Sequence, residues 1–197
     1  MKIIDKEIIN EIIIEKSRFI TYLKRVDSID EANEYLQTIK KKHYDATHHC
    51  FALIIDDIVR SNDNGEPSGT AGVPILDVLK KNDITNTICV VVRYFGGIKL
   101  GAGGLVRAYS SSCSEALKLA SFITKKTFKR YSIIIDYKTY NSIINMIKDY
   151  IYKSDFTHNV ELEIDIDNLD ILDKIKDISL GNAQIKYLCD VSKYVSI

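Results

Sequence analysis

Five of the nine glycines fall between Gly96 and Gly104, inside the segment RYFGGIKLGAGGLVRAYS at 93–110. An apolar run ends where the segment begins and a helical pattern follows, so we expect a strand, a loop and then a helix. Glycine permits positive φ and close approach, and a helix start offers unpaired N–H groups to an anion. The alternative is a tight crossover whose glycines serve packing alone. The residues predicted to bind phosphate or nucleic acid are Arg93, Gly96, Gly97, Lys99, Gly101, Gly103, Gly104 and Arg107.

A second polar loop, NDNGEPSGTAG at 62–72, places Asp63 and Glu66 three residues apart. Two carboxylates beside an anion site could hold a divalent ion or act as acid and base. The alternative is a structured turn, in which Asp63 and Asn64 bond their own backbone, Gly65 takes positive φ and Glu66 stays solvated. We interpret the loop as such a turn and keep His48, Asp63 and Glu66 as candidate polar partners of the glycine-rich segment.

Other chemistry-bearing patterns are incomplete. His48, His49 and Cys50 lie on an expected strand, where neighbours point to opposite faces. A zinc site needs about four ligands, so we expect no metal and no cofactor. A Cys50 nucleophile with a histidine base would lack a third, orienting group. The P-loop pattern is absent and the dinucleotide pattern GxGxxG fails at Val106.

The composition limits the classes of partner that the chain can bind. Lys plus Arg equals Asp plus Glu, at 27 each among 197 residues, so any polyanion site must be a local patch. The start, MKIIDKEIINEII, is charged throughout and resembles neither a signal peptide nor a membrane span. The four cysteines are scattered, which favours reduced thiols. We expect a cytoplasmic protein with no membrane partner.

Periodicity predicts the elements that would position these loops. We expect a strand over 12–26 and then a helix to Lys42, opened by a capping box of Ser28 and Glu31. A hairpin at 50–55 and 58–60, a helix capped by Thr70 and a central strand over 87–95 follow. After the glycines, apolar residues at three- and four-residue spacing predict a core-facing helix. They are Leu105, Val106, Tyr109, Cys113, Ala116, Leu117 and Ala120.

Beyond the basic segment at 125–130 the pattern changes. Strands are expected at 131–137, 151–156, 160–166 and 184–190, and helices at 139–150 and 168–178. This β-α-β-β-α-β order suggests a ferredoxin-like domain. Acidic residues alternate with apolar ones near 161–167, as on a solvated sheet face, and we interpret this part as a binding module.

Three blocks resemble the YigZ/IMPACT family: HHCFA at 48–52, RSNDNGEPSGTAGVPIL at 60–76 and VVVRYFGGIKLGAGGLVRAYS at 90–110. The resemblance implies an α+β protein. Residues 1–126 would form a two-layer α/β domain like domain four of elongation factor G, of the ribosomal protein S5 domain 2 type. Residues 131–197 would form the ferredoxin-like domain. The family usually has two acidic residues before GEP, whereas the second here is Asn64, which weakens a metal role for that loop.

For eukaryotic relatives, the resemblance implies regulation of translation by competition for the activator of an initiation-factor kinase. We therefore expect a non-enzymatic, translation-associated regulatory protein that binds RNA, the ribosome or a protein partner in translation through the glycine-rich segment. One alternative is an enzyme that acts on a phosphorylated or nucleotide-like small molecule at the same loop. Another is a protein-interaction module that binds neither.

Overall fold

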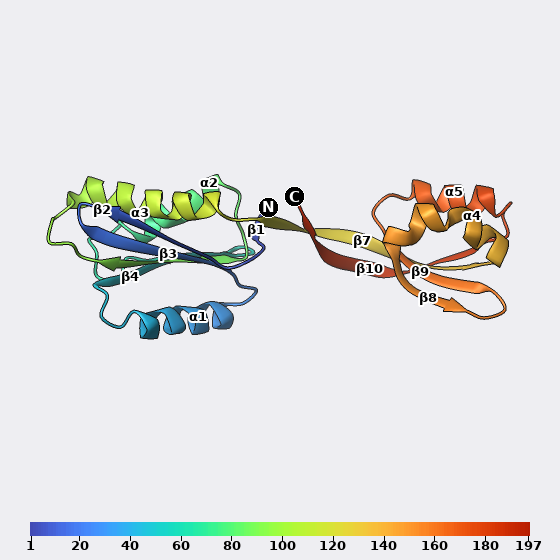
Figure 1. The fold of residues 1–197 in the computed structure, drawn as a ribbon, viewed down its shortest axis with the longest axis horizontal. Coiled ribbons are helices and arrows are strands. Elements are labelled where there is room, and N and C mark those ends of the chain that lie inside the picture. Colours follow the sequence, from blue (N-terminus) through green and yellow to red (C-terminus); the bar gives the residue numbers. More distant parts are fainter. The chain divides into compact units, whose positions relative to one another are not determined.

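The computed structural model describes residues 1–197, which form two compact units of mixed α and β structure (Figure 1). The first unit comprises Met1–Thr124 and Ser196–Ile197, and the second comprises Lys125–Val195. No helix in the chain is long and apolar enough to cross a membrane.

The first unit is built on an antiparallel sheet with the strand order β2-β3-β6-β4-β5. The strands are β2 (Ile8–Ile14), β3 (Ser17–Arg25), β4 (His48–Ile55), β5 (Ile58–Asn62) and β6 (Thr87–Tyr94). The short strand β1 (Ile3–Ile4) pairs instead with the start of β7 (Phe122–Ile135). β6 lies at the centre of the five strands, as its continuous apolar run predicted.

Helices cover both faces of this sheet, so the expected two-layer arrangement is wrong. α1 (Ile29–Lys42) lies on one face, and α2 (Gly72–Lys81) and α3 (Gly101–Lys118) lie on the other (Figure 1). The cause is visible in β6, whose side chains are apolar on both sides. Val90 and Val92 join the core beneath α1, whereas Cys89 and Val91 join the core beneath α2 and α3.

Local sequence signals explain α1 and one hairpin. Ser28 accepts a hydrogen bond from the Glu31 amide and begins α1, as the capping box predicted. The single strand expected over 12–26 is wrong, because the chain reverses between β2 and β3 at Glu15 and Lys16. Both residues have positive φ, at 45° and 64°. Hairpin turns of that conformation usually carry Asn or Gly, so the turn was not evident from the sequence.

The second unit has the β-α-β-β-α-β element order. Its elements are β7, α4 (Tyr137–Ile147), β8 (Ile151–Phe156), β9 (Val160–Ile166), α5 (Asp170–Ile178) and β10 (Gln184–Ser196), with a 3₁₀ turn at Lys148–Tyr150. β9 lies between β7 and β8, and β10 pairs with β7. α4 and α5 cover one face and bury a core of Ile, Leu and Val.

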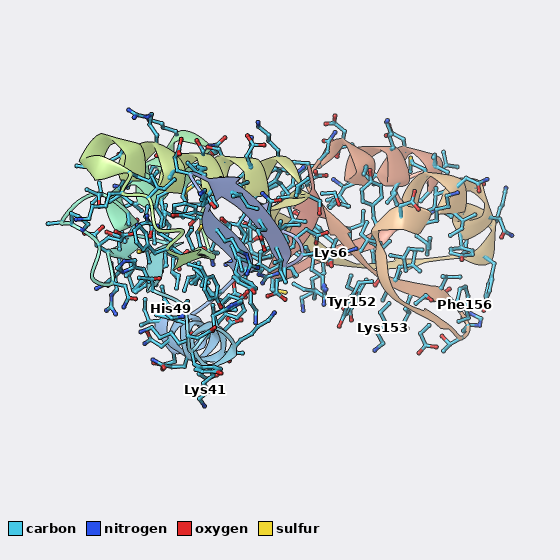
Figure 2. All side chains as sticks on the ribbon, turned by 60° about the vertical axis from the view of Figure 1, so that its left-hand side comes forward. Lys6, Lys41, His49, Tyr152, Lys153 and Phe156 are labelled. Atoms are coloured by element: carbon cyan, nitrogen blue, oxygen red, sulfur yellow. The ribbon has the colours of Figure 1, made fainter.

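The other face of the second unit carries charged pairs rather than a cationic surface. Asp165 on β9 accepts hydrogen bonds from Arg130 at 2.6 and 2.8 Å, and Lys193 lies 2.7 Å from the same carboxylate. The Arg130 guanidinium lies over the Tyr152 ring at 3.4 Å. Tyr152, Lys153 and Phe156 are exposed on the edge strand β8 (Figure 2). Arg130 and Lys193 are therefore paired with carboxylates, those of Asp165 and, 3.9 Å from Arg130, of Glu163.

Candidate functional site: a buried polar cluster beside the glycine-rich segment

The site begins with a row of three residues on adjacent strands. In the sheet register, Arg93 on β6 is paired with Phe19 on β3 and with His48 on β4. Side chains paired across neighbouring strands lie on the same face, and here that face is the one covered by α2 and α3. The sheet therefore brings a cation and an imidazole together from positions 45 residues apart in sequence.

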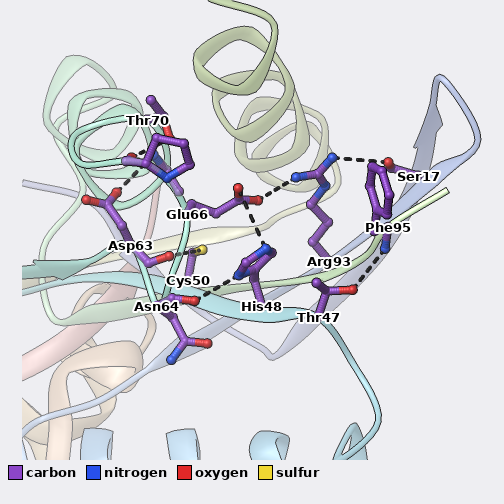
Figure 3. Close-up of polar contacts among 12 residues, drawn as sticks. Ser17, Thr47, His48, Cys50, Asp63, Asn64, Glu66, Thr70, Arg93 and Phe95 are labelled. Carbon is purple, nitrogen blue, oxygen red and sulfur yellow. Dashed lines mark hydrogen bonds and ion pairs between the residues drawn. The ribbon is translucent and has the colours of Figure 1, made fainter. Parts of the chain in front are cut away.

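Glu66 reaches this row from the loop between β5 and α2 (Figure 3). Its Oε1 accepts hydrogen bonds from Arg93 Nη1 and from Tyr109 Oη, both at 2.7 Å, and its Oε2 lies 3.7 Å from His48 Nε2. The Glu66 side chain is only 3% exposed, so the expectation of a solvated Glu66 is wrong. The carboxylate is buried because a guanidinium and a phenol compensate for the water that it loses.

Arg93 is directed inward rather than towards solvent. Its Nη2 donates to Ser17 Oγ at 3.3 Å, and its guanidinium lies 5.4 Å from the Phe19 ring and 5.5 Å from the Phe95 ring. The residue is 4% exposed. The positive charge of Arg93 is thus balanced by Glu66 inside the fold, which leaves Lys99 and Arg107 as the exposed cations of the segment.

Burial also decides the chemistry of Cys50. Its thiol donates to the Asp63 carbonyl oxygen at 2.9 Å and lies 3.3 Å from Tyr109 Oη. Burial raises the pKa of the Cys50 thiol to about 12. A nucleophilic cysteine needs a populated thiolate, so the geometry does not support the Cys50–histidine alternative. His48 contributes its Nδ1 hydrogen to the Asn64 carbonyl at 2.9 Å, since a carbonyl can only accept.

Asp63 has a structural partner of its own. Its carboxylate accepts hydrogen bonds from the backbone N–H groups of Gly69, Ala71 and Gly72 at 2.8, 3.0 and 2.8 Å. Burial raises the pKa of Asp63, but these three bonds outweigh it and the pKa lies below its usual value. Asp63 therefore caps α2, and Thr70, the expected cap, donates instead to the Pro67 carbonyl. Asp63 and Glu66 serve different partners and do not form a shared cation site.

The glycines divide into packing positions and open positions. A Cβ on Gly96 would lie 2.0 Å from the backbone carbon of Lys16, so this glycine lets the segment pack on the β2–β3 turn. Gly97 and Gly101 have positive φ, at 86° and 69°, and no atom would lie within 4 Å of an added Cβ. α3 already begins at Gly101. Gly103 and Gly104 therefore lie in its first turn rather than in a loop, Gly103 near the Arg107 guanidinium and Gly104 against the Leu100 side chain.

Two hollows flank the residues between Phe95 and α3. The larger, of about 420 Å³, lies between the β2–β3 turn and α3 and includes Arg107 in its lining. The smaller, of about 230 Å³, lies above Glu66 and Arg93 at the start of α3. Lys99 and Leu100 line both. Lys99 and Arg107 border the larger recess, which also contains Glu15, and Lys99 and Gly101 border the smaller one, where Glu66 is paired with Arg93.

Two members of the cluster were not among the sequence-predicted site residues. Tyr109 was assigned to the core stripe of α3, which it does occupy, but a buried tyrosine hydroxyl requires a polar partner. Ser17 lies at the start of β3, where it receives bonds from Arg93 Nη2 and from the Gly96 amide at 3.2 Å. Only the sheet register brings Ser17 next to residues 93–96.

Comparison with known proteins gives consistent matches. Residues 15–117 match the model of the Impact N-terminal domain. The chain is 49% identical over 160 residues to the IMPACT family member YvyE of Bacillus subtilis strain 168, covering 78% of this chain and 74% of that protein. It is 34% identical over 183 residues to the IMPACT family member YigZ of Escherichia coli K12, covering 87% and 90%. A crystal structure of a hypothetical protein has the same fold, with a TM-score of 0.62, 32% identity and coverage of 95% of this chain and 97% of that one.

Proposed function

The chain belongs to the IMPACT family, and from this premise we propose that it is a translation-associated regulatory protein that binds RNA or a ribosomal partner. The family resemblance supplies the link to translation. The observation that carries the mode of binding is the pairing of Lys99 and Arg107 with open glycine backbone at Gly97 and Gly101. In a chain with no net charge, this local cationic segment is the feature suited to phosphate.

We propose different roles in binding for the N-terminal and C-terminal parts of the chain. Residues 1–126, which we propose to resemble domain four of elongation factor G, would carry the phosphate contacts. Residues 131–197, which we propose to be ferredoxin-like, would add a second surface. We propose the cytoplasm as the location, where translation occurs. Arg93 takes the role of a positioning residue, because its ion pair with Glu66 anchors the strand from which residues 95–100 continue.

The enzymatic alternative has weaker support in the geometry. Glu66 is buried and held by Arg93 and Tyr109, and the other ring nitrogen of His48, Nε2, lies 3.7 Å from the Glu66 carboxylate inside the cluster. A general base must be free to take a proton from a substrate. Calorimetry with ATP and magnesium separates the two functions, since tight nucleotide uptake would favour the enzyme.

Ribosome co-sedimentation across a salt series tests the proposal. We would compare the native chain with the double variant Lys99→Gln/Arg107→Gln, leaving Arg93 in place because its loss would unpair Glu66. Lys80→Gln/Lys81→Gln, at the exposed end of α2, is the matched control with the same change in charge. Losing two phosphate contacts should make the slope of log K against log salt shallower by about 1.4 for a single strand.

The outcomes are distinct. Binding that falls in the Lys99/Arg107 variant and persists in the control supports a nucleic-acid or ribosome site at this segment. Equal pelleting of both variants would remove the segment from the interface. Absence of pelleting for the native chain even at low salt would refute the translation function.

A further inference from the structure

The start of α3 is a helix N-terminus without a cap. The helix is 18 residues long, its N-cap residue Leu100 makes no side-chain cap bond, and its first turn holds no acidic residue. The first N–H groups of a helix have no partner within it, and that end carries about half a positive charge. Gly101, Ala102 and Gly103 are all exposed. The backbone donors of this turn therefore belong to exposed residues.

The smaller hollow lies directly over these donors. Its apolar wall comes from Pro67, Phe95, Leu100 and Leu105. Glu66, Arg93, Lys99, Gly101 and Ala102 complete a lining whose surface is largely apolar. A volume of about 230 Å³ is smaller than the about 300–1,000 Å³ of most small-molecule sites. The hollow suits one charged group on a short organic body rather than a whole cofactor.

Arg93 supplies a second, independent observation beside the helix end. Its two terminal nitrogens are bonded to Glu66 and Ser17, as Figure 3 shows, but Nε is buried with no hydrogen-bond partner. The residue is 4% exposed and lines the hollow. Buried donors are nearly always satisfied. The lining thus holds a charged donor for which the protein provides no acceptor.

We propose that this hollow binds a single phosphoryl group, with donors from the first turn of α3 and from Lys99 Nζ, beside the unpaired Arg93 guanidinium nitrogen. Glu66 and Arg93 balance each other, so Lys99 and the helix end leave the hollow with about one and a half positive charges. A phosphoryl group carries one to two negative charges and three oxygens that can accept from donors in different directions. The inference rests on the proposed function, because it names the part of RNA or nucleotide that this segment would hold.

Inorganic phosphate is the first probe, titrated into ¹⁵N-labelled full-length protein while backbone amide shifts are recorded. We expect saturable shifts at residues 101–104. Lys99→Gln should weaken binding about fivefold, because it removes one unit charge near the anion. Ala102→Asp should abolish binding, since it places a carboxylate at the exposed helix start.

Ser114→Asp is the matched control for Ala102→Asp, with the same charge change on the same helix. Position 114 lies 12 residues further along, about 18 Å at 1.5 Å per residue, which exceeds the screening length of about 8–10 Å. Phosphate affinity should stay within twofold of native in this variant. Absence of saturable shifts in the native protein, or equal loss in both aspartate variants, would overturn the inference.

Competition experiments identify the source of the phosphoryl group, and comparison with ribosome pelleting tests the pocket separately from the proposed function. A short RNA with a 5′-phosphate, its 5′-hydroxyl counterpart and AMP are each competed against phosphate. Displacement by only the phosphorylated RNA identifies a terminal monoester, displacement by both RNAs a backbone diester, and displacement by AMP alone a free nucleotide. Failure of all three to displace phosphate would overturn the site as a phosphoryl pocket. Phosphate binding without ribosome pelleting would refute the proposed function alone. Ribosome pelleting without phosphate binding would refute the pocket alone.

Discussion

The cap that Asp63 provides to α2 predicts a specific loss of stability. Asp63→Asn keeps one oxygen, which can still accept from Ala71 and Gly72, but puts an NH₂ group opposite the Gly69 amide. The bonds from Ala71 and Gly72 remain but no longer have a charged acceptor, and the bond from Gly69 is lost. Charge-assisted bonds contribute about 1.5–3 kcal/mol and neutral ones about 1 kcal/mol, and cap removal costs about 0.5–2 kcal/mol. We expect the free energy of unfolding to fall by about 2 kcal/mol.

Urea unfolding followed by circular dichroism measures this loss, and the melting temperature should fall by about 4–8 °C. Asp57→Asn is the control, since it makes the same change at an exposed hairpin position and should cost less than about 0.5 kcal/mol. The reasoning is refuted if the two variants are equally stable.

The pH dependence gives a second check on Asp63. Its folded pKa lies below the ordinary value, so the ionised form is favoured by folding. That contribution is present above the ordinary pKa of about 3.9 and is lost as pH falls through the folded pKa. The stability gap between native protein and Asp63→Asn should therefore be full near pH 7 and shrink below about pH 4. A gap that widens in acid would contradict the assignment.

Three other predictions concern the Glu66 and Asp165 carboxylates and the thiols. Glu66→Gln leaves the Arg93 guanidinium buried without its counter-charge, so it should cost about 3–5 kcal/mol in urea unfolding; an unchanged midpoint would contradict the ion pair. Hydrogen bonds from Arg130 and then Lys193 lower the pKa of Asp165 from 3.8 to about 2. About 2 kcal/mol of folding stability should therefore be present above about pH 4 and lost towards pH 2. Acid titration that follows the unfolding of the second unit would show this loss. A chromogenic thiol reagent should label one of the four cysteines in native protein, the exposed Cys189, and all four in denaturant; rapid labelling of a second thiol would contradict the burial of the others.

Short-range signals made much of the fold predictable. The capping box at Ser28 lies within four residues, and the apolar run of β6 and the stripe of α3 are periodic patterns. Such signals depend on neighbours in the chain, which explains why α1, β6, the hairpin after β4 and the β-α-β-β-α-β order agree with expectation. The β2–β3 turn was missed because Glu15 and Lys16 are not typical turn residues.

The family, the main elements and the segment rich in glycines and cations could be predicted from the sequence, because each depends on residue types and their spacing along the chain. The contacts of the polar residues, in contrast, depend on how the strands and loops pack together. The register of β3, β6 and β4 aligns Phe19, Arg93 and His48, and the loop fold sends Glu66 inward and Asp63 to α2. Burial is a property of the assembled fold, so no local pattern could show that Arg93 is enclosed while Lys99 remains exposed.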